Sequence, residues 1–267
     1  YLGKPGVLAM KHIVMFSGGI ASWMAAKRVA EEHGTEDLIL LFADTGIEDE
    51  DLYRFLEEAA ANVGGTLIRL KEGRTPWEVF HDVKYMGNSR VDPCSRVLKR
   101  DLIRKMVEDN YSSDETIIYM GMDWTEGHRL TRTAAAWEPW VVKAPMMEKP
   151  LMMKEQMMEE SRKAGIAPPR LYDMGFPHNN CGGFCVKAGQ AHFALLLERM
   201  PERYAEHEAE EAKFQKFIGK PVTVMRDRSG KKTTPLSMKE FRERQEESRV
   251  GSFDDLDWGG CGCFVGD

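Results

Sequence analysis

The fold is decided by residues 12–22, which read HIVMFSGGIAS. The apolar run from His12 to Phe16 is typical of a buried strand. Apolar residues then recur at helical spacing from Ile20 to His33, and Gly34 marks the end of the expected helix. The glycines in between permit a tight turn with exposed backbone N–H groups, next to the positive end of the helix dipole. Strand, loop and helix together form a candidate phosphate-binding site.

The same alternation continues through the first half of the chain. Strand-like runs are expected at residues 38–42, 66–70 and 116–120, and the acidic residues at 48–51 are typical of the start of another helix. Strands that alternate with helices predict a parallel sheet with crossover helices on its faces. We therefore expect an α/β fold with a doubly wound, mostly parallel sheet, in which ligands bind at the carboxyl ends of the strands.

The pattern changes near residue 145. The later sequence predicts helices at residues 154–163 and 190–217, the second of them broken near Pro201, around a segment rich in Cys and Gly. We expect three parts: a lead-in at residues 1–9, an α/β domain with the phosphate loop at 10–145, and a helical, cysteine-containing C-terminal region at 146–267.

Composition excludes several classes of protein. Apolar residues make up 42% of the 267 residues, and no run approaches the ~18 apolar residues that cross a membrane. Lys and Arg number 37 against 43 Asp and Glu, so the net charge of −6 argues against binding nucleic acid through bulk positive charge. Five cysteines are too few for a disulfide scaffold. We expect a cytoplasmic protein that does not associate with membranes.

Five ordered motifs resemble those of one enzyme family. The loop at 17–22, SGGIAS, resembles the Ser-Gly-Gly-x-Asp-Ser loop of the PP-loop family, the adenine nucleotide α-hydrolases, with Ala21 in place of the aspartate. Four later stretches are similar to the PAPS reductase-like branch of that family, and the resemblance implies a HUP/Rossmann-like fold. These stretches are FADTG at 42–46, DPCSRVLK at 92–99, the Gly-to-Arg segment at 121–132, and LYDMGFP with two following cysteines at 171–185.

The resemblance also implies a site for an adenine nucleotide. Phosphates are expected on the first loop, and adenine and ribose beside the Asp-Thr pair that follows the second strand. The residues expected to bind the nucleotide are Ser17, Gly18, Gly19, Ile20, Ala21, Ser22, Phe42, Asp44, Thr45 and Gly121. The residues expected to act in catalysis near the phosphates are Arg129, Arg132 and His128.

The cysteines are spaced for a metal centre. Three residues separate Cys181 from Cys185 and one separates Cys261 from Cys263, and glycine in each spacer lets the chain fold around a metal. Four thiolates suit either tetrahedral zinc or a [4Fe–4S] cluster. In cluster-bearing relatives of the family that the sequence resembles, ligands come from the positions of Cys94, Cys181 and Cys185. We therefore favour a [4Fe–4S] cluster completed by Cys261 or Cys263, with Zn²⁺ as the alternative.

These features suggest an enzyme that splits ATP or a related adenine nucleotide between its α and β phosphates, with Mg²⁺. The resemblance implies that this activation is coupled to sulfur transfer or to nucleic-acid modification, so the expected partners are the nucleotide, DNA or tRNA, and a sulfur donor or redox partner. Two alternatives stay open. One is a nucleic-acid-directed hydrolase that binds a base or nucleoside in the same pocket and holds structural zinc. The other is a non-catalytic nucleotide sensor.

Overall fold

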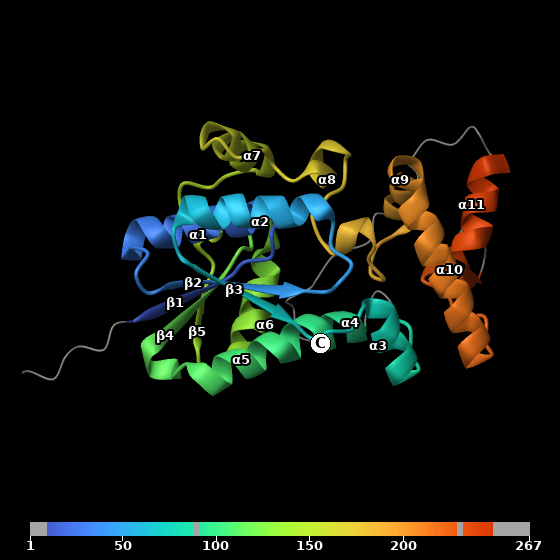
Figure 1. Ribbon diagram of the computed structural model, residues 1–267, viewed down its shortest axis with the longest axis horizontal. Coiled ribbons are helices and arrows are strands. Elements are labelled where there is room, and N and C mark those ends of the chain that lie inside the picture. The colour runs from blue at the N-terminus through green and yellow to red at the C-terminus, as the bar shows by residue number, and fades with distance from the viewer. Residues whose placement is uncertain (1–9, 88–90, 229–231, 248–267) are drawn as a thin grey trace, which may run out of the picture.

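Residues 10–87, 91–228 and 232–247 are described by the computed structural model (Figure 1). A five-stranded sheet lies at the centre, formed by β1 (Lys11–Met15), β2 (Leu38–Asp44), β3 (Thr66–Lys71), β4 (Thr116–Met120) and β5 (Val141–Lys143). The strand order is β3-β2-β1-β4-β5, and each neighbouring pair is parallel. This arrangement confirms the predicted α/β fold with a doubly wound parallel sheet.

The sheet extends in opposite directions from β1. Ile13 pairs with Ile39 of β2 on one side and with Ile118 of β4 on the other. The chain first adds β2 and β3 on one side and then returns to add β4 and β5 on the other. The carboxyl ends of β1 and β4 therefore border the topological switch point, where open α/β sheets form a crevice for ligands.

Helices cover both faces of the sheet (Figure 1). On one face lie α1 (Ile20–His33), α2 (Glu50–Val63) and α7 (Lys154–Lys163), and on the other lie α5 (Leu102–Asn110) and α6 (Gly127–Trp137). A cluster of buried apolar side chains fills the space between helices and sheet on each face. Parallel strands need this cover, because their apolar side chains point to both faces. The bounds of α1 and α7 agree with those expected from sequence.

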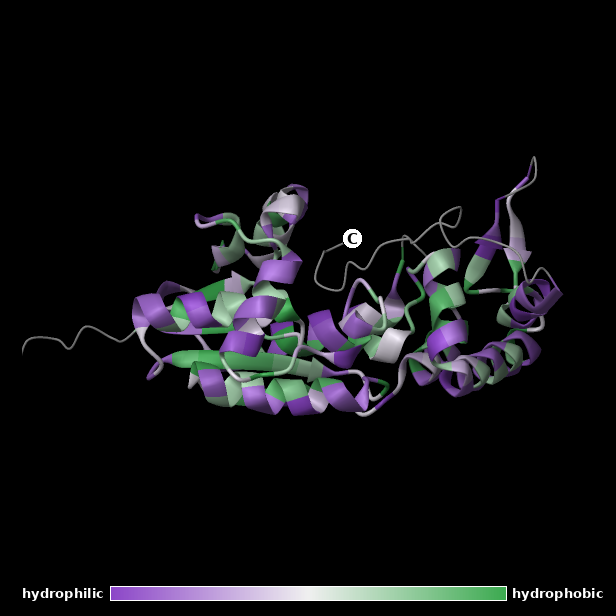
Figure 2. Cartoon of the chain, turned by 90° about the horizontal axis from the view of Figure 1, so that it is seen from above, coloured by the Kyte–Doolittle hydropathy of each residue, from purple (hydrophilic) through white to green (hydrophobic). Residues whose placement is uncertain are grey.

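A further apolar cluster joins one helix of the first half to the helices after residue 170. Figure 1 shows α9, α10 and α11 beyond the carboxyl end of the sheet, and Figure 2 shows that apolar and polar segments alternate along the chain in this part of the molecule. The elements are α3 (Pro76–Val83), α4 (Pro93–Ser95), α8 (Arg170–Asp173), α9 (Gln190–Arg199), α10 (Pro201–Ile218), β6 (Met225–Asp227), β7 (Thr234–Leu236) and α11 (Met238–Glu247).

One buried carboxylate ties the last elements together. Glu211 of α10 is 2% exposed, and it accepts hydrogen bonds from the backbone N–H of Val224 at 2.8 Å and of Met238 at 2.6 Å. These bonds attach the β6–β7 hairpin and α11 to α10. Burial raises the pKa of Glu211 to about 6.

Two of the apolar clusters contain residues from both sides of position 145. Met146 and Met157 pack in the cluster of α1 and α2, and Trp77 and Phe80 of α3 pack in the cluster of α9 and α10. The division at 145 and 146 therefore does not coincide with a boundary between cores, and the two-part organisation stays a prediction. The expected lead-in at 1–9 lies outside the described residues.

In the part of the chain that the structure describes, no helix combines the length and the apolar character needed to cross a membrane.

Candidate functional site

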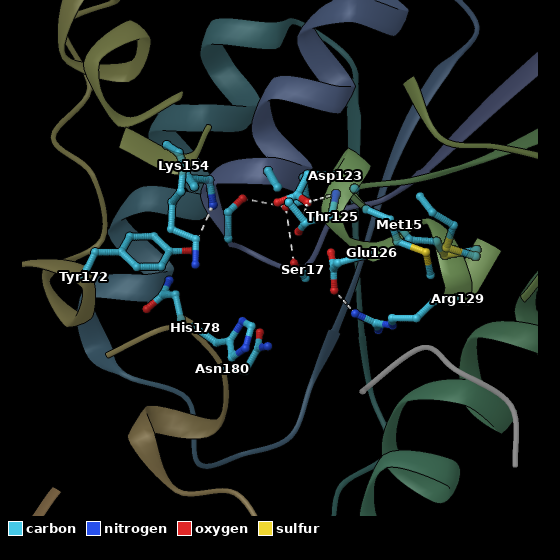
Figure 3. A pocket seen from close by; sticks show the side chains of 18 residues that line it. Met15, Ser17, Asp123, Thr125, Glu126, Arg129, Lys154, Tyr172, His178 and Asn180 are labelled. Carbon is cyan, nitrogen blue, oxygen red and sulfur yellow. Dashed lines mark hydrogen bonds and ion pairs between the residues drawn. The ribbon is translucent and has the colours of Figure 1, made fainter. Parts of the chain in front are cut away.

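A cavity of about 250 Å³ opens at the switch point, beyond the carboxyl ends of β1 and β4 (Figure 3). Three segments line it: the loop from β1 into α1, the residues between β4 and α6, and parts of the chain from α7 to residue 180. The cavity therefore occupies the place where this topology binds ligands.

The loop after β1 is held close to both neighbouring strands. Gly18 has a φ of +77°, and a Cβ there would lie 2.9 Å from Leu52 Cγ of α2. A Cβ on Gly121, directly after β4, would lie 2.7 Å from Ser22 Cα in the first turn of α1. Glycine is needed at both positions, at the first for its backbone conformation and at the second for close approach. Ser17 Oγ donates to Ser22 Oγ at 3.3 Å.

The start of α1 faces the cavity without a side-chain cap. Its N-cap residue is Gly19, which lines the cavity with Ile20, Ala21 and Ser22. The N–H of Ile20 donates to Tyr172 Oη at 3.2 Å, while Ser22 Oγ donates back to the carbonyl of Gly19 at 2.8 Å. The amino end of a 14-residue helix thus meets the cavity with its positive dipole.

The wall on the β4 side carries charge. Asp123 Oδ1 accepts from Thr125 N–H at 2.9 Å and so caps the short 3₁₀ turn before α6. Arg129 forms an ion pair with Glu126, and both side chains line the cavity (Figure 3). The Nε of Arg129 is buried and has no hydrogen-bond partner within the described ranges. Because buried N–H groups normally have an acceptor, this group is available to donate to a ligand oxygen.

The opposite wall comes from the second half of the chain. Lys154 Nζ donates to the carbonyl of Pro177 at 2.5 Å and lies 5.5 Å from the centre of the Tyr172 ring. Asn179 is 2% exposed, and its Nδ2 donates to the carbonyl of Gly18 at 2.8 Å. Its Oδ1 is buried and finds no partner in the described part of the chain.

His178 on the same wall is a neutral group at physiological pH. Burial lowers its pKa to about 4, and the positive charge of Lys154 acts in the same direction. His178 thus offers one ring N–H donor and one acceptor to the cavity rather than a charge.

The predicted site residues fall into two groups. The cavity is lined by Ser17, Gly19, Ile20, Ala21, Ser22, Gly121 and Arg129, whereas Gly18 contributes only its carbonyl to Asn179. His128 and Arg132 are exposed on α6 and do not line the cavity.

The residues expected at adenine and ribose lie beside β2. Phe42 is buried in the core and packs edge-on against Tyr53. Asp44 Oδ1 accepts from Tyr53 Oη at 2.8 Å. Thr45 Oγ1 donates to Glu48 at 2.8 Å. None of the three lines the cavity, so their role at the nucleotide stays a prediction.

The three described cysteines meet at a second cavity. Cys94, from α4, lines it together with Cys181 and Cys185, more than 80 residues later in the chain. Lys99 Nζ lies 3.9 Å from Cys181 Sγ and 3.5 Å from Glu48 Oε1, and both charged side chains are almost fully buried. None of these cysteines forms a disulfide.

The metal prediction is only partly addressed by this arrangement. Within residues 10–87, 91–228 and 232–247, no group of three or more His, Cys, Asp or Glu side chains is arranged to hold a metal ion. Cys261 and Cys263, the expected source of the fourth thiolate, lie outside the described residues. The metal ligands stay a prediction.

Sequence reasoning assigned no role to three residues that line the cavity, Lys154, Asn179 and Glu126. Lys154 and Asn179 contribute to the cavity from more than 130 residues beyond the loop, and Glu126 pairs with a predicted arginine. The only local signal was the polar run at 178–180, which a sequence alone does not distinguish from an ordinary surface loop.

Comparison with known proteins gives three results. No protein-family model matches the chain. A segment of 112 residues, 41% of the chain, is 31% identical to an uncharacterized protein from Methanocaldococcus jannaschii, and the match spans about a fifth (22%) of that protein.

The fold is similar to the crystal structure of phosphoadenylyl-sulfate (PAPS) reductase from Candida auris in its phosphate complex. The TM-score is 0.44 at 13% identity, and the match covers 64% of this chain and 81% of that one. This similarity concerns the fold alone, and the description of the site rests on the residues that line it.

Proposed function

We propose that the cavity binds ATP or a related adenine nucleotide with its phosphates against residues 17–22. The supporting observation is that the start of α1 and a glycine-rich loop meet at the switch point of a parallel sheet. Backbone N–H groups at a helix start are donors suited to phosphate oxygens.

The resemblance of the loop to PP-loop enzymes supports cleavage between the α and β phosphates. An acceptor oxygen loses its proton and attacks the α phosphorus, the bond from that phosphorus to the bridging oxygen breaks, and pyrophosphate leaves. A nucleophile from the sulfur donor, or water, then attacks the adenylated acceptor and displaces AMP. Negative charge grows on the leaving pyrophosphate during the first step. Arg129 Nε, which has no protein acceptor among the described residues, and the N–H groups of the loop are placed to stabilise that charge.

Mg²⁺ fits the residues of the cavity. Asp123 and Glu126 bring carboxylate oxygens to the wall beside the loop, and these are the ligands that Mg²⁺ prefers together with phosphates. When bound, the ion neutralises phosphate charge. Arg129 then holds Glu126 in place through their ion pair.

The sulfur chemistry is proposed on the cysteine cavity. Three thiols from two distant segments line one small space beside a buried lysine. These are the donors that a [4Fe–4S] cluster or Zn²⁺ would take, with a fourth from Cys261 or Cys263. We assign no step of the reaction to such a centre.

The test is to incubate the protein with ATP and Mg²⁺, with and without tRNA or DNA, and to separate the products by chromatography. Equal amounts of AMP and pyrophosphate support the proposal. ADP and phosphate would contradict the cleavage position. ATP binding without turnover would favour a nucleotide sensor, and base or nucleoside release without ATP would favour the hydrolase.

A further inference from the structure

Lys154 differs from Arg129, the other cation that lines the cavity, in having no direct ion-pair partner among the described residues. Arg129 is paired with Glu126, whereas Lys154 forms no ion pair with any residue that the structure describes. Its ammonium is partly buried, and burial lowers its pKa in spite of the opposing effect of Asp123. A cation withdrawn from water costs free energy unless an anion offsets it. Among the described residues, no carboxylate forms a direct ion pair with the Lys154 ammonium, although Asp123 and Glu155 act on it from further away.

The side chain of Lys154 is held in place by groups that connect it to the loop at residues 17–22. Its ammonium lies over the ring of Tyr172 and donates to the carbonyl of Pro177. Tyr172 Oη accepts the N–H of Ile20, at the start of α1. Lys154 and the loop are thus fixed relative to each other by a single intervening side chain (Figure 3).

A second group on this wall also lacks a partner. Asn179 Oδ1 is buried, unpartnered in the described ranges, and belongs to the cavity lining, while its Nδ2 holds the carbonyl of Gly18. Buried polar atoms of this kind normally have a hydrogen-bond partner. Two independent observations on one wall therefore point to a ligand there. An anionic group of the ligand suits the Lys154 ammonium, and a hydroxyl or amine of the same ligand suits the acceptor Oδ1 of Asn179.

We propose that Lys154 binds a phosphate group of the nucleotide from the wall opposite β4, so that the phosphates lie between α1 and α7. This inference rests on the proposed function, because it assigns a residue of the same cavity. It makes the second half of the chain part of the phosphate site, and it makes phosphates, rather than adenine or ribose, the part of the ligand that Lys154 recognises.

The test is calorimetric titration of the full chain with ATP and with adenosine. Lys154→Gln retains a donor for Pro177 and removes the charge, and it is expected to weaken ATP binding by about 10-fold to 100-fold, as for a hydrogen bond to a charged group. Adenosine binding is expected to stay within about twofold. Lys163→Gln is the matched control at the other end of α7, where Lys163 pairs with Glu160, and it should leave both affinities unchanged.

A measurement on the unaltered protein covers the case in which Lys154→Gln does not fold. ATP and pyrophosphate should protect Lys154, but not Lys163, from acetylation in a mass-spectrometric assay, and adenosine should protect neither. Equal ATP affinity in wild type and Lys154→Gln, equal losses for ATP and adenosine, or acetylation of Lys154 at an unchanged rate under saturating ATP would each overturn the inference. Failure of the wild type to bind ATP at all would instead overturn the proposed function.

Discussion

Gly121 is the point where β4 comes closest to α1, and a single methyl group there tests how the phosphate loop is positioned. In Gly121→Ala the new Cβ would lie 2.7 Å from Ser22 Cα and 2.9 Å from Ser22 N. Both are backbone atoms, so no side-chain rotation relieves the contact. To reach an ordinary contact of 3.4 Å, the start of α1 must move by about 0.7 Å relative to β4.

This displacement has two expected consequences. Overpacking of a tight contact should lower the free energy of unfolding by about 1–3 kcal/mol, measured by denaturant titration. A shift of this size in a group that positions the reacting phosphates should lower AMP formation by about 10-fold to 100-fold. Stability and turnover fall together because the same contact supports both.

The matched control is Gly127→Ala, six residues along the chain at the start of α6. A Cβ there meets nothing within 4 Å, and its φ of −53° is an ordinary helical value. This variant should be unchanged or up to about 1 kcal/mol more stable, with unaltered turnover. If Gly121→Ala matched wild type in both assays, the loop would not be held against β4 as described.

Three further variants test separate parts of the account. Arg129→Ala should lower AMP formation by about 10²–10³-fold if Nε stabilises the leaving phosphates, whereas Arg132→Ala, exposed one turn later, should be close to wild type in the same assay; the reverse order would transfer the role to Arg132. Glu211 has a folded-state pKa raised to about 6, so its folded form binds a proton more tightly and its contribution to stability should fall as pH rises from about 4.5 to about 6. The free energy of unfolding of wild type minus that of Glu211→Gln, measured by denaturant titration, should therefore be about 2 kcal/mol larger at pH 4.5 than at pH 7. A difference that does not change with pH would refute the assignment. Cys185→Ser should lose bound iron or zinc in elemental analysis of anaerobically purified protein, and full metal content would remove Cys185 from the ligands.

Local periodicity was enough to predict much of the fold. The apolar spacing of α1 and the short run of β4 gave their bounds, because each element buries a face that repeats at its own period. The sheet then follows from the rule that alternating strands and helices form parallel crossovers. The π-helical segment at Arg96–Asp101 was not predicted, since no residue pattern distinguishes it from an ordinary helix turn.

The site was predictable where one local segment builds it. The loop, Gly121 and Arg129 follow directly after strands at the switch point, so topology alone brings them to the cavity. Lys154 and Asn179 arrive through tertiary packing of a distant segment, which no local pattern reports. Phe42 was placed in the site by resemblance, but its side chain points into the core beside Tyr53.

The central claim is that the cavity at the switch point holds the phosphates of an adenine nucleotide. Its most direct test is a crystal structure of the full chain grown with Mg²⁺ and a non-hydrolysable ATP analogue. We predict phosphate density between the start of α1 and the ammonium of Lys154. Density for the analogue elsewhere on the protein, with Arg129 still paired only to Glu126 and the loop contacted by no ligand, would contradict it.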